Sequence, residues 1–355
     1  MMNNMNQYSR NRHFSAAETC RWMARFSAPV VLLLILLVRT MPALAADPLA
    51  QRTGFFFDTI ITVSLYDTDD ESILDECFSD MNYYESIFSR TLEGSDVWNI
   101  NHSEGSAVEV AEDTLDIVGQ ALYYCELSDG AFDITIAPVV DLWDFTSLDE
   151  EDHVLPDEDE LNEALTHVDF NGVIVDREAG TITLTDPEAE IDLGGIAKGY
   201  ISARIREKIM ELGSESALIN LGGNIVGVGS RPDGTDWKIG IRRPFGESAY
   251  DIIAVVPASD KAVITSGTYE RYFELDGVLY HHILDPQTGY SVSNGLSSVT
   301  ILTEDATAGD ALSTACFILG PEDGMALIEG LDGVEALFID ESEVLTASSG
   351  WPGDL

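Results

Sequence analysis

The chain has 355 residues, of which 45% are hydrophobic and 23% are charged. This apolar content is that of an ordinary globular protein, and it excludes both an intrinsically disordered chain and a multi-span membrane protein. The 18 Lys and Arg against 63 Asp and Glu give a net charge of −45, so no basic surface is available for nucleic acid and we expect no such partner. Because the chain is so negative, an anionic ligand would need a positively charged group at its binding site.

Residues 1–45 have the pattern of a secretory signal peptide. Four arginines precede an apolar run at residues 28–38, and the small-residue segment Ala43-Leu44-Ala45 follows it. We expect cleavage after Ala45 or Ala46 and a mature protein in the periplasm or another extracytoplasmic compartment, with some membrane association if the signal is retained. The alternative is a transmembrane anchor, although such a run spans only about 16 Å as a helix, roughly half of the hydrocarbon core.

The first half of the mature chain mixes strand and helix patterns. Alternation predicts one strand from Phe55, and apolar spacing predicts helices over residues 73–88 and 112–127. The acidic stretch 147–159 predicts a surface loop or a boundary between two lobes near residues 147–160. A hairpin is expected in VIVDREAGTITL, with its turn near residues 178–180.

Strands dominate the second half. A helix is predicted over residues 195–212 with Gly213 as its cap, and strands or hairpins then follow up to about residue 303. Two helices, over residues 308–319 and 322–330, and two short strands complete the chain. Since strands mostly neighbour strands, we expect an α+β fold of mixed sheets with inserted helices, forming a single domain over residues 46–355.

The cysteines of the mature chain carry no metal-ligand spacing. Cys77, Cys125 and Cys316 each lie on the apolar face of a predicted helix. We therefore predict three buried structural thiols and no disulfide framework.

Five segments are polar and rich in glycine where a plain core would be apolar: residues 128–138, 191–200, 220–224, 264–289 and 308–320. Taken alone, each has an ordinary structural interpretation as a helix cap, a hairpin turn, a strand or a capped helix start. Segment 128–138, for example, would be a helix cap followed by a strand with Asp133 exposed. Together the five segments need a common explanation, and a ligand site provides one.

Segment 191–200, IDLGGIAKGY, predicts a site for phosphate. A strand ending in Asp192 and two glycines lead into a helix with Lys198 in its first turn. Glycine lets the backbone approach a phosphate, the helix N-terminus offers free N–H groups, and lysine adds positive charge. The alternative is a strand-to-helix turn followed by a solvated lysine.

The last two segments add a histidine pair and two hard oxygens. His281 and His282 alternate across a predicted strand, so one should face a site and the other should not. Asp310 and Thr314 share one face of a predicted helix and point their oxygens at the same spot. Such oxygens, completed by phosphate and water, suit Mg²⁺. The combination predicts phosphoryl-group chemistry on a nucleotide.

These segments resemble the ApbE family of FAD:protein FMN transferases over roughly residues 54–330. The resemblance rests on eight ordered motifs: FDTIITV, SDVWNIN, GAFDITIAPVVDLW, IDLGGIAKGY, NLGGN, TSGTYERYF, HHILDPQTG and DALSTACFILG. The resemblance implies a two-lobed flavin transferase fold. It also implies an enzyme that cleaves the diphosphate of FAD with the help of Mg²⁺. It also implies that FMN is placed on a Ser or Thr of an exported or membrane-embedded acceptor flavoprotein, such as an electron-transport subunit, and that AMP is released.

The resemblance also implies roles for individual residues. His282 matches the residue proposed to assist attack by the acceptor hydroxyl, and a free imidazole pKa of about 6.5 suits proton transfer at neutral pH. We therefore predict catalytic roles for His282 and Asp310. The metal ligands matched are Asp310, Thr314 and the main-chain carbonyl of Gly195; the FAD-contacting positions matched are Phe57, Ala131, Phe132, Asp133, Asp192, Lys198 and Ile283.

Four residues depart from the family's usual pattern and bear on flavin contacts and turn rigidity. Phe57 stands where Met is common, Asn224 where Asp is frequent and Gln287 where Arg is usual, and Thr268 replaces a small polar or acidic residue. Two rival functions use the same segments. One is hydrolysis of FAD to free FMN and AMP, and the other is flavin binding without catalysis.

Overall fold

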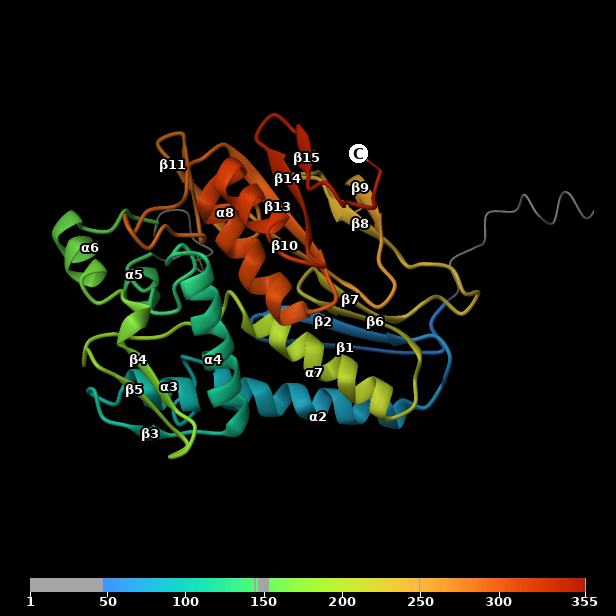
Figure 1. Cartoon of the computed structure of the whole chain (residues 1–355), viewed down its shortest axis with the longest axis horizontal. Coiled ribbons are helices and arrows are strands. Elements are labelled where there is room, and N and C mark those ends of the chain that lie inside the picture. Colours follow the sequence, from blue (N-terminus) through green and yellow to red (C-terminus); the bar gives the residue numbers. More distant parts are fainter. Residues whose placement is uncertain (1–46, 144, 146–152, 249, 355) are drawn as a thin grey trace, which may run out of the picture. The chain divides into compact units, whose positions relative to one another are not determined.

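A computed structural model describes residues 47–143, 145, 153–248 and 250–354 (Figure 1). The predicted signal peptide and residues 147–152 of the predicted acidic loop lie outside the described residues. Pro48–Leu355 form one compact unit.

An antiparallel sheet of eight strands is the centre of this unit. Its strand order is β1-β2-β6-β7-β10-β13-β14-β15, so the N-terminal hairpin lies at one edge and the C-terminal strands lie at the other. The strands are β1 (Ala50–Phe56), β2 (Thr59–Leu65), β6 (Ser216–Leu221), β7 (Asn224–Gly229), β10 (Ala262–Gly267), β13 (Leu296–Thr303), β14 (Glu335–Asp340) and β15 (Leu345–Ala347).

The single strand predicted from Phe55 was wrong. The segment turns back on itself at Phe57 and Asp58, whose φ angles are 51° and 56°, and it forms the β1–β2 hairpin. Two consecutive residues in the left-handed region make the tight turn that matches the twist of paired strands. The hydrophobic alternation runs through this turn, which is why it read as one strand.

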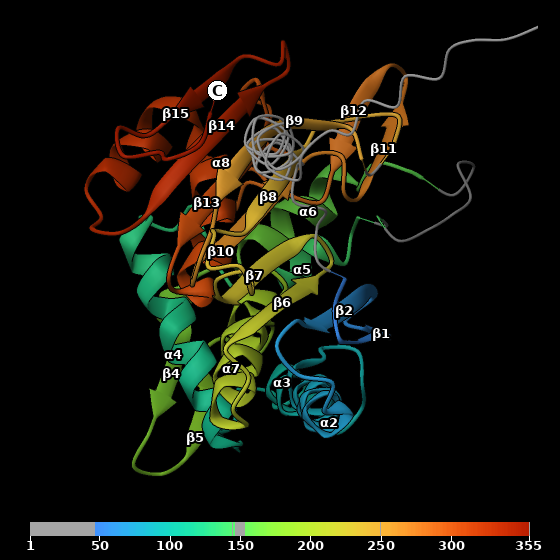
Figure 2. The same cartoon turned by 90° about the vertical axis from the view of Figure 1, so that its right-hand side faces the viewer.

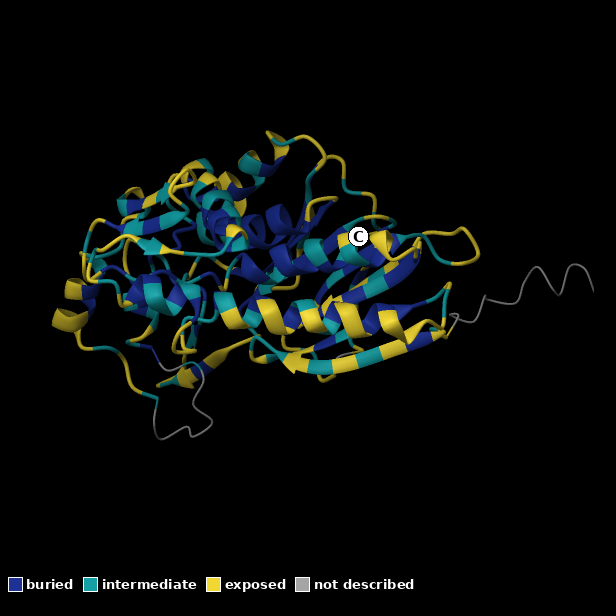
Figure 3. Ribbon diagram, turned by 90° about the horizontal axis from the view of Figure 1, so that it is seen from below, coloured by how far each residue is buried: buried dark blue, intermediate teal, exposed yellow. Residues whose placement is uncertain are grey.

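Three helices cover one face of the sheet, as Figure 1 shows: α2 (Glu71–Phe88), α7 (Ala197–Glu211) and α8 (Ala306–Glu329). A fourth, α4 (Glu112–Leu127), packs against α8. The predicted spacing in α2 and α4 is confirmed, because one face of each carries the buried residues. Figure 3 shows dark-blue buried residues inside the unit and exposed residues on its outer side.

The two helices predicted near the C-terminus join into α8 with a kink between them. Gly320 has a φ of 84°, and Pro321 follows it, so the helical hydrogen bonding is interrupted there. Among the described residues, α8 is the one helix long and apolar enough to cross a membrane, and 50% of its apolar stretch is buried inside the protein. Buried core helices share that composition.

The C-terminal half of the sheet is covered on both faces. Within β10, Ile264 belongs to the main core beneath the helices, whereas the neighbouring Val263 belongs to a second cluster with Val256. Adjacent strand residues point to opposite faces, so the hairpin of β8 (Lys238–Arg242) and β9 (Ile252–Pro257) covers the face away from α8.

The remaining elements are short helices and small sheets of two or three strands. They lie near α4 and in the segment between β10 and β13. Figure 2 shows the β4–β5 hairpin beside α4. A third cluster surrounds Trp143, Leu161 and Phe273. These elements are α3 (Asp96–Asn101), β3 (Val108–Glu109), α5 (Ala137–Val140), α6 (Glu158–Leu165), the 3₁₀ turn η2 (Phe170–Gly172), β4 (Val173–Asp176), β5 (Thr181–Leu184), β11 (Tyr272–Leu275) and β12 (Val278–His281).

The segregation of helices and antiparallel strands confirms the α+β class. The three predicted buried thiols, Cys77, Cys125 and Cys316, are all buried and free.

Candidate functional site

The site is built where α7 crosses α8. Gly199 makes this crossing possible, since a Cβ there would lie 2.2 Å from the backbone oxygen of Ala306 and 2.6 Å from the Cβ of Asp310. The close approach lets the Gly199 N–H donate to Oδ2 of Asp310 at 2.8 Å. One amide of the first turn of α7 therefore fixes the carboxylate on α8.

The other oxygen of Asp310 also has polar neighbours. Asn224, the first residue of β7, donates from Nδ2 to Oδ1 at 2.9 Å, and Nζ of Lys198 lies 3.8 Å from the same oxygen. Asp310 is only 3% exposed, and a buried carboxylate is costly unless donors and cations surround it. It is held in a polar setting, not in hydrocarbon.

Thr314 lies one turn further along α8. Its Oγ1 is 3.2 Å from Oγ of Ser266 at the end of β10. A Cβ on Gly195 would lie 3.6 Å from Thr314 Oγ1 and 2.9 Å from a ring carbon of Phe132. Gly195, Thr314 and Phe132 are thus neighbours, and the absence of a side chain on Gly195 leaves room for the Phe132 ring.

These groups fit a hard divalent cation. Among the described residues no cluster of three or more His, Cys, Asp or Glu side chains could hold a metal, so a cation here would take a mixed set of oxygens. Asp310 would supply a carboxylate, Thr314 a hydroxyl and Gly195 a main-chain carbonyl. An incomplete protein shell of oxygens, finished by water and phosphate, is what Mg²⁺ accepts.

The glycine turn before α7 is held by ion pairs and backbone contacts. Asp192 accepts from the Gly194 N–H at 2.6 Å through Oδ1, and its Oδ2 lies 3.1 Å from Nε of Arg90. Lys198 donates from Nζ to the Gly194 carbonyl at 3.1 Å. Asp192 therefore shapes the turn, while Lys198 places a partly exposed cation beside it.

The two histidines differ in exposure and in the partners of their ring nitrogens. His281 is buried; its Nε2 lies 2.9 Å from the Val292 carbonyl and its Nδ1 accepts from the Ile283 N–H. His282 is half-buried, and its Nδ1 lies 3.3 Å from the Arg271 carbonyl. A carbonyl can only accept, so Nδ1 of His282 carries the proton and Nε2 keeps its lone pair.

The pKa expected for His282 from its free imidazole was wrong. Burial, followed by the charge of Lys198, lowers the pKa of His282 to about 3. The ring is therefore neutral at physiological pH and can accept a proton or a hydrogen bond through Nε2. It is a weaker base than a free imidazole.

Glu270 was missed by the sequence analysis. Desolvation by the surrounding protein raises its pKa to about 7 although the side chain retains solvent access, and Asp310 adds to this shift. Lys198, Arg271 and Arg242 act in the opposite direction. Glu270 thus lies within the field of the charged groups at this site.

The ordinary structural interpretation of segment 128–138 is right about the helix cap, since Ser128 caps α4, but wrong about the strand and about an exposed Asp133. Asp133 is 8% exposed, and its carboxylate accepts from the Thr135 N–H and hydroxyl and from the Phe170 N–H. Burial raises the pKa of Asp133. The segment is a turn held together by the buried Asp133 and not a strand, and its Phe132 ring lies beside Gly195.

Two predicted flavin contacts lie apart from these polar contacts. The Phe57 N–H donates to Glu85, and Ile283 is buried beside His281. No hydrogen bond or ion pair among the described residues joins either to Asp310. Four further residues at the site were not predicted as site residues: Arg90, Asn224, Ser266 and Glu270. Asn224 and Ser266 fall within recognised motifs, whereas Arg90 carries no sequence signal.

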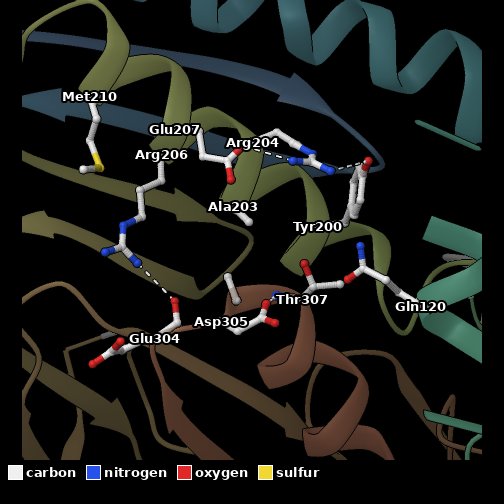
Figure 4. Close-up of a pocket in the computed structure, with 11 residues that line it drawn as sticks. Gln120, Tyr200, Ala203, Arg204, Arg206, Glu207, Met210, Glu304, Asp305 and Thr307 are labelled. Atoms are coloured by element: carbon white, nitrogen blue, oxygen red, sulfur yellow. Dashed lines mark hydrogen bonds and ion pairs between the residues drawn. The ribbon is translucent and has the colours of Figure 1, made fainter. Parts of the chain in front are cut away.

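A cavity of about 450 Å³ opens further along the same two helices (Figure 4). Its cations are already neutralised: Arg204 pairs with Asp116 and Glu207, and Arg206 pairs with Asp260. Asp305 caps the N-terminus of α8 at this cavity. The site around Asp310 is therefore the stronger candidate for phosphate chemistry.

A buried carboxylate, a hydroxyl, a lysine and a helix N-terminus therefore lie together on an α+β scaffold, as the phosphate-site prediction requires. The model of the ApbE family matches residues 57–338, and the chain belongs to this family.

Several known flavin transferases are similar to this chain over most of its length. An FAD:protein FMN transferase of Klebsiella pneumoniae is 36% identical over 81% of this chain and 88% of its own length. One of Treponema pallidum is 35% identical over 84% and 87%. The crystal structure of the ApbE protein of Thermotoga maritima superposes with a TM-score of 0.77 at 36% identity, covering 84% of this chain and 97% of that one. The flavin transferase ApbE of Vibrio cholerae gives 0.75 at 28% identity, with the same coverage.

Proposed function

We propose that this enzyme transfers FMN from FAD to a Ser or Thr hydroxyl of an acceptor flavoprotein and releases AMP, with Mg²⁺ as its metal. The family membership and the names of the relatives support flavin transfer. The observation that carries the proposal is the pair Asp310 and Thr314, held beside Gly195 and Lys198.

In this proposal the acceptor oxygen forms a bond to the FMN phosphorus, and the bond to the bridging oxygen of the diphosphate breaks. AMP leaves with that electron pair, and the hydroxyl proton passes to a base. Asp310, Thr314 and the Gly195 carbonyl would hold Mg²⁺, which when bound supplies positive charge against the diphosphate. Lys198 orients the phosphates and stabilises the leaving AMP.

His282 has the right form for the proton acceptor. Its Nδ1–H is directed to the Arg271 carbonyl, so Nε2 is free to accept from the acceptor hydroxyl. Because its pKa is about 3, it is unprotonated over the whole physiological range. It acts by orienting the hydroxyl and taking its proton as the new phosphoester forms.

Asp310→Asn tests the proposal. This change keeps the size of the side chain but removes a negative charge needed for the cation, so we expect at least about a 100-fold loss of FMN transfer. The assay incubates protein with FAD, Mg²⁺ and a Thr-containing acceptor peptide, and mass spectrometry detects the FMN adduct.

Asp323→Asn, on an exposed turn of the same helix, is the matched control and should transfer normally. Near-normal transfer by a folded Asp310→Asn protein would overturn the metal assignment. Free FMN without an adduct in the wild-type reaction would identify the enzyme as a hydrolase instead. FAD that stays intact would indicate a carrier.

We also propose that residues 1–45 direct export, so that the acceptor is an exported or membrane-embedded flavoprotein. The apolar run and the small residues before Ala46 support this proposal.

A further inference from the structure

Two arginines differ from the others in this acidic protein. The described part of the chain has nine arginines, and seven of them form an ion pair with a carboxylate. Arg242 and Arg271 form no ion pair with any described carboxylate, and both are exposed. With a net charge of −45, counter-charges are abundant, so two unpaired guanidinium groups are a marked exception.

Both arginines lie at the candidate site. Each acts on the charge of Glu270, as Lys198 does. The main chain of Arg271 holds His282 through the hydrogen bonds between its carbonyl and the His282 N–H and ring. Arg242, at the end of β8, lies 5.5 Å from the centre of the Tyr269 ring, next to Glu270 in the chain. The two arginines are therefore neighbours of Glu270 and His282, and His282 is where the proposed reaction needs the acceptor hydroxyl.

A cluster of aromatic rings adjoins Arg242 through Tyr269. Phe245 is 48% exposed, and its ring meets those of Tyr269 and Tyr272 edge to face at 6.0 and 5.3 Å. Tyr272 is 46% exposed. Phe245 also has a φ of 54°, a conformation that bulky residues rarely adopt. Aromatic and arginine side chains together are typical of protein-binding surfaces.

We propose that Arg242, Phe245, Arg271 and Tyr272 form the acceptor-docking surface, and that it binds an acidic segment with an apolar side chain next to the modified hydroxyl. The inference rests on the proposed transfer reaction and names the chemistry of its protein partner. Most of this protein's surface repels an acidic segment. The electrostatic attraction for such a segment is therefore strongest at the two unpaired arginines. The aromatic rings supply the apolar contact.

Binding can be measured without catalysis. The probes are two synthetic Thr-containing peptides of the same sequence, one with Asp and one with Asn at the positions beside the Thr. We expect fluorescence anisotropy to show the Asp peptide binding wild-type protein at least about fivefold more tightly than the Asn peptide. The doubly substituted Arg242→Glu/Arg271→Glu protein should lose this preference. Equal binding of the two peptides by wild-type protein would overturn the proposal.

A charge-matched control comes from two lysines. Lys238 and Lys261 also form no ion pair with a described residue, and neither is among the largest influences on the pKa of Glu270. Lys238 is at the other end of β8 from Arg242, about 13 Å away along the strand. Lys238→Glu/Lys261→Glu makes the same change in net charge, and it should leave the preference for the Asp peptide intact. Equal losses in both double variants would show that total charge alone matters, which contradicts a docking surface.

Kinetics separate this inference from the proposed function. In the transfer assay, Arg242→Glu/Arg271→Glu and Phe245→Ser should raise KM for the Asp peptide about tenfold and leave KM for FAD within about twofold. A rise in KM for FAD alone would assign the surface to the nucleotide and overturn docking. If wild-type protein binds the Asp peptide selectively but forms no adduct, the transfer reaction fails while the docking surface stands.

Discussion

Glu270 and His282 lie in the field of the same lysine, and desolvation by the surrounding protein favours the uncharged form of each side chain. Desolvation raises the pKa of Glu270 to about 7 and lowers that of His282 to about 3, because it opposes a negative charge on one and a positive charge on the other. The effect of Lys198 follows charge as well: it favours ionised Glu270 and disfavours protonated His282. Near neutral pH, Glu270 is therefore the group at this site that changes charge.

Glu270→Gln should change how stability depends on pH. The ordinary pKa of the carboxyl is 4.5 and rises to about 7 in the folded protein. The folded state then holds its proton more tightly than the unfolded state, and the stability this gives is lost as pH rises through about 7. Glutamine cannot ionise, so the melting temperature of the variant relative to wild type should be higher at about pH 8 than at about pH 5.

Thermal melts at the two pH values measure this difference, and Glu274→Gln, on the exposed strand β11, controls for the loss of a charge. A difference between Glu270→Gln and wild type that stays constant with pH would contradict the prediction.

Single residues of the site were predictable to different degrees. Asp310 and Thr314 followed from their spacing on a helix, and Lys198 followed from a glycine turn before one. Asn224 and Glu270 did not, because their roles depend on contacts or fields from α7 and α8, far away in the sequence. No local pattern encodes which side chain a buried carboxylate will meet across a fold.

At the scale of elements, the α7–α8 crossing depends on one missing side chain. Gly199→Ala would bring Cβ within 2.2 Å of a backbone oxygen, which the helices can relieve only by separating. We expect a loss of about 1–3 kcal/mol in the free energy of unfolding and a larger loss of transfer, since the N–H bonded to Asp310 moves away. Urea titrations and the adduct assay measure the two effects.

Gly119→Ala, in α4, is the matched helical control. A Cβ there would meet only the guanidinium end of Arg177, a flexible and 58% exposed side chain. Its stability should stay within about 1 kcal/mol of wild type. Equal destabilisation by the two substitutions would contradict the crossing as the cause, because helix propensity favours alanine over glycine at both positions.

Regular elements were the most predictable part of the fold. The helix predicted from apolar spacing over residues 112–127 has the same bounds as α4. A helix with one buried face has apolar residues at a regular spacing of three to four, which is easy to recognise in the sequence. Expectations were wrong where the backbone leaves regular geometry. The turn at Phe57-Asp58 keeps the alternation on both sides of it, and the turn after Gly130 is held by the buried Asp133. Tertiary contacts decided both.

At the scale of the whole molecule, the excess of carboxylates determines which cations remain unpaired. Most arginines are neutralised by neighbouring carboxylates, so the unpaired cations stand out by position more than by number. Composition alone predicted that an anionic ligand requires a local cation. It could not place that cation, because the placement depends on which carboxylates the fold brings near each arginine.

Export of the whole chain gives a prediction at this scale. When the full-length protein is produced in a bacterial host, N-terminal sequencing of the extracytoplasmic fraction should begin at Ala46 or Asp47. Leu33→Asp/Leu36→Asp interrupts the apolar run and should keep an uncleaved chain in the cytoplasm. Full-length protein that retains Met1 and fractionates with membranes would instead support an anchor.

The buried thiols have a consequence for the environments in which the enzyme can work. Burial raises the pKa of Cys77, Cys125 and Cys316 to about 12 in each case, so none presents a reactive thiolate. The described chain also has no disulfide for a reductant to open. Within the described residues, stability therefore depends on packing and hydrogen bonds, and we expect the melting temperature to be the same with and without a thiol reductant.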